Sequence, residues 1–129
     1  MSDAVKEELI VLNQRLLESI AAGDWATYEQ LCDPQLTCFE PEARGQLVAG
    51  MEFHRFYFAD GGSSSRRNTT MCSPKVWLMG DSAVLAYVRL VQYTDASGNF
   101  MTGSYEETRV WQKRDGAWKH VHFHRSLPS

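Results

Sequence analysis

Four segments in the second half of the chain alternate apolar and polar residues with the period of two that is typical of β-strands. They cover residues 69–79, 83–94, 100–113 and 117–125. The segments are separated by short turn signals, namely Gly80-Asp81, the loop 95–99 and the Asp115-Gly116 pair. Connections this short join antiparallel neighbours, so the sequence predicts an antiparallel meander of four strands.

The first half of the chain has mainly helical periodicity. Apolar residues recur at steps of three and four from Val5 to Ile20, which predicts a long amphipathic helix over residues 4–21. We expect a second helix over 25–32, a short strand over 35–39 and a third helix over 47–59. Because the third helix is apolar nearly all round, we expect it to be buried on more than one side, in part by another subunit.

Helices that precede a meander predict an α+β fold in which the helices pack on one face of the sheet. We expect a strongly curved antiparallel sheet wrapped around the long N-terminal helix, which makes a cone with an open mouth. A chain of 129 residues is long enough for one hydrophobic core, so residues 1–129 are predicted to form a single domain.

Charge and cysteine content argue against several classes of protein. The formal net charge is −3, whereas nucleic-acid binding usually needs a basic surface. Three cysteines without a CxxC pair argue against a disulfide framework or a zinc site and favour a reducing compartment. The sequence does not open on a signal-peptide pattern, and no apolar run approaches the roughly 18 residues of a membrane span. We therefore expect a cytoplasmic protein that binds neither nucleic acid nor membrane.

Two arginines interrupt the apolar faces of the predicted strands. Arg89 lies in LAYVRLVQY and Arg109 lies in YEETRVW, each with aromatic residues on its own face. A guanidinium stays charged in a protein, so a buried one needs partners. One interpretation is that both arginines pair with Glu106 or Glu107, or lie on a solvated face. The other is that they line a cavity that binds a small carboxylate, with Tyr28 and Tyr57 supplying shape and hydroxyl groups.

The last predicted strand contains candidate metal ligands. His120, His122 and His124 alternate in the last predicted strand, so we expect all three on one face, where at most two can reach one ion. No carboxylate or cysteine obviously completes such a set, and we predict no metal site and no cofactor. His54 lies on the apolar third helix, where a lone histidine is usually part of the core.

No arrangement of residues indicates catalysis. The sequence has no GxSxG, Walker loop or HExxH motif. Cys32 lies at the end of a helix, where the dipole disfavours a thiolate. Glu40 and Glu42 are predicted to be loop residues. We therefore predict no catalytic residues.

Two segments, FEPEARGQLVAGMEFHRFYF and YEETRVWQKRDGAWKHVHFHRS, closely resemble the association (hub) domain of calcium/calmodulin-dependent protein kinase II. GDWATYEQLCDPQLTCFEPEA and AYVRLVQY extend the resemblance to essentially the whole chain. The resemblance implies the α+β cone shared with nuclear transport factor 2, also called cystatin-like. It also implies assembly into two stacked rings, which are dodecameric, tetradecameric or larger.

The resemblance further implies a deep pocket that takes small carboxylates. The pocket residues by position are Tyr28, His54, Arg89, Arg109 and Arg125, and Tyr57 is placed with them by its aromatic character. A basic residue of some family members matches Arg66 or Arg67 only loosely, because the loop GGSSSRRN is shortened.

The chain departs from the kinase in lacking a kinase domain, a calmodulin-binding segment and a linker. It is either an excised hub or a free-standing hub-like protein, and the helix that directly follows Met-Ser-Asp favours the second. Hub domains of the kinase are candidate partners in mixed rings.

These observations favour a non-catalytic oligomerisation hub. The interface is predicted to contain aromatic residues, namely Phe53, Phe56, Phe58, Trp77, Trp111 and Phe123. The alternative is a small-molecule enzyme of the same cone fold, such as an isomerase, dehydratase or cyclase, with His54 as the candidate base.

Overall fold

The computed structural model describes residues 2–59 and 67–128 and begins with a long helix, α1 (Ser2–Ala22). Leu9, Leu16 and Leu17 are fully buried on one side of α1, as the spacing of three and four predicts. Gly23 ends the helix with a positive φ of 68°. The side chain of Asp24 then caps α2 (Trp25–Leu31) by accepting a hydrogen bond from the Thr27 amide.

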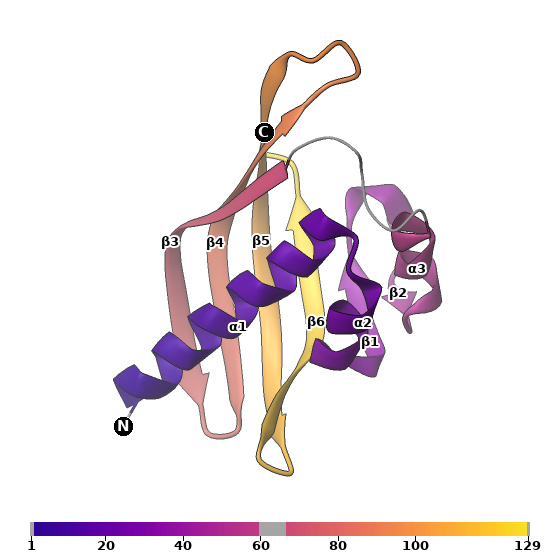
Figure 1. Ribbon diagram of the computed structural model, residues 1–129. Coiled ribbons are helices and arrows are strands. Elements are labelled where there is room, and N and C mark those ends of the chain that lie inside the picture. The colour runs from indigo at the N-terminus through magenta and orange to yellow at the C-terminus, as the bar shows by residue number, and fades with distance from the viewer. Residues whose placement is uncertain (1, 60–66, 129) are drawn as a thin grey trace.

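Six strands form one curved sheet in the order β2-β1-β6-β5-β4-β3, and α1 crosses one face of it (Figure 1). The strands are β1 (Cys32–Phe39), β2 (Val48–Ala49), β3 (Arg67–Met79), β4 (Ser82–Thr94), β5 (Phe100–Arg114) and β6 (Ala117–Ser126). Four of the neighbouring pairs are antiparallel, whereas β1 and β6 run parallel. The α+β class and the four-stranded meander are therefore confirmed, and the sheet contains one parallel pair that the sequence did not indicate.

The third predicted helix, over 47–59, is wrong in its length. A 3-10 turn (η1, Pro41–Ala43) and β2 come first, and α3 covers only Glu52–Phe58. Ala49 pairs with Thr37 of β1, and the Gly50 amide donates to the Leu36 carbonyl at 2.7 Å. Strand pairing thus outweighs the helical pattern, and α3 lies on the surface with Phe56 79% exposed. Most of the loop GGSSSRRN lies outside the described residues.

A bulge in β6 changes which histidines share a face. Trp111 of β5 pairs with His120, whereas Val110 pairs with His122, so β6 has one extra residue at this point. His120 consequently points into the core and is fully buried, while His124 is exposed on the other face. The expectation that all three histidines share one face is therefore wrong.

A polar contact through the core fixes α1 on the sheet. Asn13 is fully buried; its Oδ1 accepts a hydrogen bond from Trp111 Nε1 at 3.0 Å, and its Nδ2 donates to Tyr87 Oη at 2.9 Å. Buried polar groups of this kind are costly if any partner is lost. Asn13 therefore sets the position of α1 along strands β4 and β5, whose inner faces carry the arginines.

None of the helices in the described ranges, 2–59 and 67–128, combines the length and the apolar character that crossing a membrane requires.

We expect Asn13→Ala to lower the free energy of unfolding by about 2 to 3 kcal/mol, because Trp111 Nε1 and Tyr87 Oη each lose a buried partner. Urea denaturation followed by tryptophan fluorescence measures the change. Gln14→Ala on the same helix is the control, since Gln14 is only partly buried, and should cost less than about 1 kcal/mol. Equal losses in the two variants would contradict the role of Asn13.

Candidate functional site

A cavity of about 260 Å³ lies between the helices and the inner face of the sheet. All six residues predicted for the ligand pocket line it, namely Tyr28, His54, Tyr57, Arg89, Arg109 and Arg125. Arg67 and two carboxylates, Glu40 and Glu42, also line it, whereas Arg66 lies outside the described residues. The structure thus brings together side chains from α2, α3 and strands β3 to β6.

The carboxylate of Glu107 joins the two arginines of the sheet. Arg109 Nη2 and Arg89 Nη1 each donate to Glu107 Oε2 at 3.1 Å. Glu107 is almost fully buried, and Arg109 is 1% exposed. The prediction that the arginines pair with a neighbouring glutamate is therefore correct for Glu107, while Glu106 faces outward. The paired side chains also line the cavity, as the second interpretation requires, and carboxylate binding there stays a prediction.

The buried charges of this cluster stabilise one another. Burial alone would raise the pKa of Glu107, but the charges of Arg109 and Arg89 outweigh it and lower that pKa to about 2. Burial would likewise lower the pKa of Arg109, and the adjacent Glu107 carboxylate raises it instead. Arg109 also lies over the ring of Phe123, with 4.3 Å between guanidinium carbon and ring centroid. The side chain is therefore held rigidly in the cavity wall.

A second cluster lies on the opposite side of the cavity. Arg125 donates from Nη2 to Glu40 Oε2 at 3.3 Å and also to Glu42. Burial would raise the pKa of Glu40, but hydrogen bonding to His54 and the charges of His54 and Arg125 lower it. Glu40 was predicted to be a loop residue, yet it is buried. The sequence did indicate this burial, because Leu36, Cys38 and Glu40 alternate with a period of two and so lie on one face of the strand.

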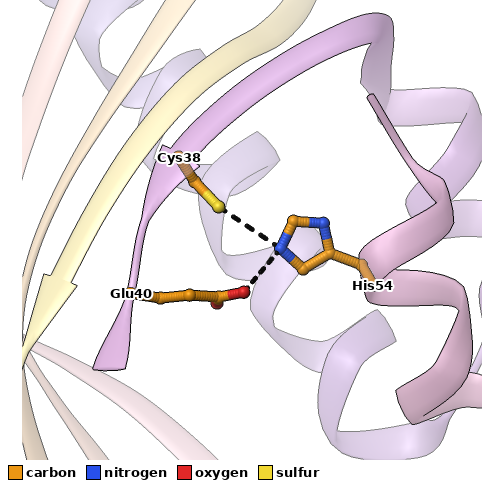
Figure 2. A group of neighbouring side chains, drawn as sticks. All are labelled: Cys38, Glu40 and His54. Atoms are coloured by element: carbon orange, nitrogen blue, oxygen red, sulfur yellow. Dashed lines mark hydrogen bonds and ion pairs between the residues drawn. The ribbon is translucent and has the colours of Figure 1, made fainter. Parts of the chain in front are cut away.

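His54 reaches this second cluster from α3 (Figure 2). Its Nε2 lies 2.9 Å from Glu40 Oε1 and 3.4 Å from Cys38 Sγ. In a catalytic triad, the nucleophile and the carboxylate contact different ring nitrogens of the histidine. Here both contact the same nitrogen, so the three residues do not form a nucleophilic triad.

A second cysteine–histidine pair lies deeper in the core. Cys32 Sγ is 3.4 Å from His120 Nδ1. Burial raises the pKa of Cys32 and of Cys38 to about 12, and burial together with the nearby Arg109 lowers the pKa of His120. Both thiols are thus neutral and poor nucleophiles at neutral pH.

The overall charge of the cavity wall is positive. Four arginines and two glutamates line it, and Glu107 behind the wall neutralises part of this excess. Such a wall favours small anions over neutral molecules of the same shape.

The residues predicted for a subunit interface fall into two groups. Phe53, Phe56 and Trp77 are exposed, with Trp77 52% exposed on β3. Phe58, Trp111 and Phe123 are buried in the protomer, where they pack in the core beside the cavity. The placement of these three at an interface is therefore wrong, because their inward-facing positions already bury them without a second subunit.

Comparison with known proteins gives matches over nearly the whole chain. Residues 5–129 match the model of the calcium/calmodulin dependent protein kinase II association domain. The chain is 52% identical over 126 residues to the calcium/calmodulin-dependent protein kinase type II subunit delta of Oryctolagus cuniculus, covering 95% of this chain and 24% of that protein. It is 50% identical over 128 residues to the type II alpha chain of Drosophila melanogaster, covering 97% and 24%. The chain spans about a quarter of the length of these relatives.

Solved structures agree with these matches. The association domain of C. elegans CaMKII superposes with a TM-score of 0.92 at 47% identity, with 97% of each chain covered. A nuclear transport factor 2-like superfamily protein from Salmonella enterica gives a TM-score of 0.82 at 23% identity, covering 100% of this chain and 94% of that one. The second similarity concerns the fold alone and confirms the cone-shaped architecture.

We expect Glu107→Gln to lower the free energy of unfolding by about 3 kcal/mol, since it removes the charge that compensates two buried arginines. The folded-state pKa of Glu107 is depressed to about 2, so its contribution is present above the ordinary pKa near 4.5 and is lost as pH falls toward 2. Urea denaturation from pH 7 to pH 3 should therefore show a smaller pH dependence in Glu107→Gln than in the unmodified protein.

Glu106→Gln is the matched control, because Glu106 is the adjacent carboxylate on the exposed face. It should change stability by less than about 0.5 kcal/mol and leave the acid dependence intact. Identical acid profiles for Glu107→Gln and Glu106→Gln would refute the role of the buried carboxylate.

Proposed function

This chain belongs to the calcium/calmodulin-dependent protein kinase II association domain family, and on that basis we propose that it is a non-catalytic oligomerisation hub that assembles into a closed, two-tiered ring of identical subunits. The observation that carries the proposal is that the face of the sheet opposite α1 exposes large apolar side chains. Closed rings bury such a surface on every subunit and leave no copy unpaired. Twelve, fourteen or more subunits satisfy this requirement.

Apolar side chains on that open face support assembly. Trp77 and Met79 of β3 and Val88 of β4 are exposed, and within residues 2–59 and 67–128 no helix covers this side of the sheet (Figure 1). Phe39 of β1 continues the face beyond β6. Large apolar side chains gathered on an uncovered sheet face mark a surface for association, so a second subunit is the natural cover.

The proposal also includes a cellular compartment and candidate partners. Cys32, Cys38 and Cys72 are free thiols, which suits the reducing cytoplasm. Hub domains of related kinases are candidate partners in mixed rings, because they share the fold and so can present a matching surface. Calmodulin binding is a property that we assign to the longer relatives and not to this chain.

We also propose a second function, binding of a small carboxylate in the arginine-lined cavity. The excess of arginines over glutamates in the wall supports it. Arg125 stacks near Tyr105, with 5.2 Å between guanidinium carbon and ring centroid, so its position at the cavity is defined by an aromatic contact as well as by charge. Guanidinium groups bind carboxylates through paired, charge-assisted hydrogen bonds.

An enzyme of the same fold is the weaker alternative. His54 is the candidate base, and its Nε2 is already engaged by Glu40 at 2.9 Å. The other ring nitrogen, Nδ1, has no hydrogen-bond partner among the described residues but is buried, so neither nitrogen is open to a substrate. We therefore propose assembly and ligand binding in preference to catalysis.

Light scattering of the purified chain at micromolar concentration should give a mass that is a large multiple of 14.7 kDa. We expect Trp77→Asp to reduce this mass, because a charge on the open face opposes its burial against a neighbour. Leu47→Asp is the matched control, since Leu47 is similarly exposed but lies in the loop before β2. A monomeric unmodified protein would overturn the hub proposal.

Butyrate should raise the midpoint of thermal unfolding, whereas butyramide, its uncharged analogue of similar shape, should not. Arg125→Gln should abolish the butyrate shift, and Arg15→Gln on the exposed side of α1 should retain it. Equal shifts with butyrate and butyramide, or in both variants, would count against a carboxylate site.

A further inference from the structure

Three side chains of different chemistry converge at one point of the second cluster (Figure 2). Cys38 and Glu40 project from the end of β1 and the residue that follows it, and His54 projects toward them from α3. One thiol sulfur, one carboxylate oxygen and one imidazole nitrogen lie within 4.8 Å of one another. Within residues 2–59 and 67–128, no other group of three or more such residues is this close together.

Hydrogen bonds link the three side chains, because His54 Nε2 contacts both Glu40 and Cys38 and the Cys38 thiol also bonds to Glu40. Nε2 of His54 carries either one proton or one lone pair, and both Glu40 Oε1 and Cys38 Sγ are directed at it. When Nε2 donates its proton to the carboxylate, it has no lone pair left for the thiol. One cation at the centre of the group can serve all three atoms at once.

Two of the three separations are close to those of a small tetrahedral ion, and the third, between Cys38 and Glu40, is within 4.8 Å. Bonds of about 2.0 to 2.3 Å to zinc hold neighbouring ligand atoms about 3.3 to 3.6 Å apart. The distance between Cys38 Sγ and His54 Nε2 is 3.4 Å, and the distance between His54 Nε2 and Glu40 Oε1 is 2.9 Å. The second distance has to widen by about 0.4 Å, which a side-chain rotation supplies.

We propose that Cys38, Glu40 and His54 bind one divalent transition-metal ion of the zinc class, with the fourth coordination position directed toward the arginine-lined cavity. Thiolate, imidazole and carboxylate together favour zinc or cobalt over calcium or magnesium, which prefer oxygen ligands alone. Glu40 and His54 both line the cavity, so the open position is reachable from it. Three protein ligands with an open position are the arrangement of reactive zinc sites, whereas structural sites have four.

The surrounding groups fit the charge of the ion. Arg125 holds Glu40 through Oε2 and leaves Oε1 for the metal, while Glu42 balances the charge of Arg125. Metal binding displaces the thiol proton of Cys38 to solvent, and two negative ligands then neutralise the divalent ion. The proton of His54 moves to Nδ1. This shift gives up the hydrogen bond from Nε2 to Glu40, which the metal bonds replace, and Nδ1 has no hydrogen-bond partner among the described residues.

The other cysteine–histidine pair provides an internal control. Cys32 and His120 are also buried, and their sulfur and nitrogen are also 3.4 Å apart. That pair has no carboxylate beside it that completes a three-residue group. Replacing Cys32 therefore removes a thiol of matching burial and contact distance without touching the proposed ligands.

The test is a titration of the full chain, carrying Cys72→Ser, with cobalt chloride after treatment with a chelator. We expect one cobalt per chain, the near-ultraviolet charge-transfer band of a thiolate–cobalt bond, and displacement of cobalt by zinc. Cys38→Ala should abolish the band and weaken cobalt binding by about 100-fold or more. Loss of a residue that only hydrogen-bonds to a metal ligand usually costs less than this. Cys32→Ala should retain both the band and the affinity.

Glu40→Gln is a second variant that does not depend on the effect of Cys38→Ala on folding. It should keep the thiolate band and weaken binding at least about 10-fold. Circular dichroism of each variant establishes that it is folded. Three results would each overturn the proposal. The first is no thiolate band with the unmodified site, the second is a band that survives Cys38→Ala, and the third is a band that is lost in folded Cys32→Ala.

Discussion

The rest of the structure depends on the contacts of the buried Glu107 carboxylate. It is buried between two guanidinium groups, and it also accepts a hydrogen bond from Tyr87 at 2.6 Å. Tyr87 in turn contacts Asn13 on α1, so one negative charge links the helix to the cavity wall. An uncompensated charge at any point of this chain of contacts would be far more costly than a lost apolar contact. The fold and the cavity are thus stabilised by the same residues.

The two faces of the sheet have separate tasks. The inner face carries the arginines and packs against α1 (Figure 1), while the outer face leaves several apolar side chains exposed. Because side chains alternate along each strand, adjacent residues such as Glu106 and Glu107 point to opposite sides. Assembly and ligand binding can therefore change independently in sequence, since a substitution on one face leaves the other face largely untouched.

Much of this organisation could be predicted from periodicity. The alternation in residues 69–125 gave the four strands, and the spacing of three and four gave α1. The extra residue of β6 could not be predicted, because a bulge reverses the orientation of side chains without altering the composition of the strand. The length of α3 was also missed, since the pairing of Ala49 with β1 is a tertiary effect. The cavity residues followed from resemblance and from the faces of the strands, whereas the pairing of Cys38 with His54 depends on the packing of α3 against β1.

The parallel pairing of β1 with β6 has a consequence for how the chain is made. Thr37 is hydrogen-bonded to His122, which is separated from it by 85 positions in the chain. The ribosome therefore synthesises β1, α3 and the first three strands of the meander before β6, the strand that joins them to β1. Until β6 emerges, the cavity has no wall on that side, and the two clusters of charge remain in water. Contacts between such distant segments close slowly, so the cavity is the last part of each new chain to form.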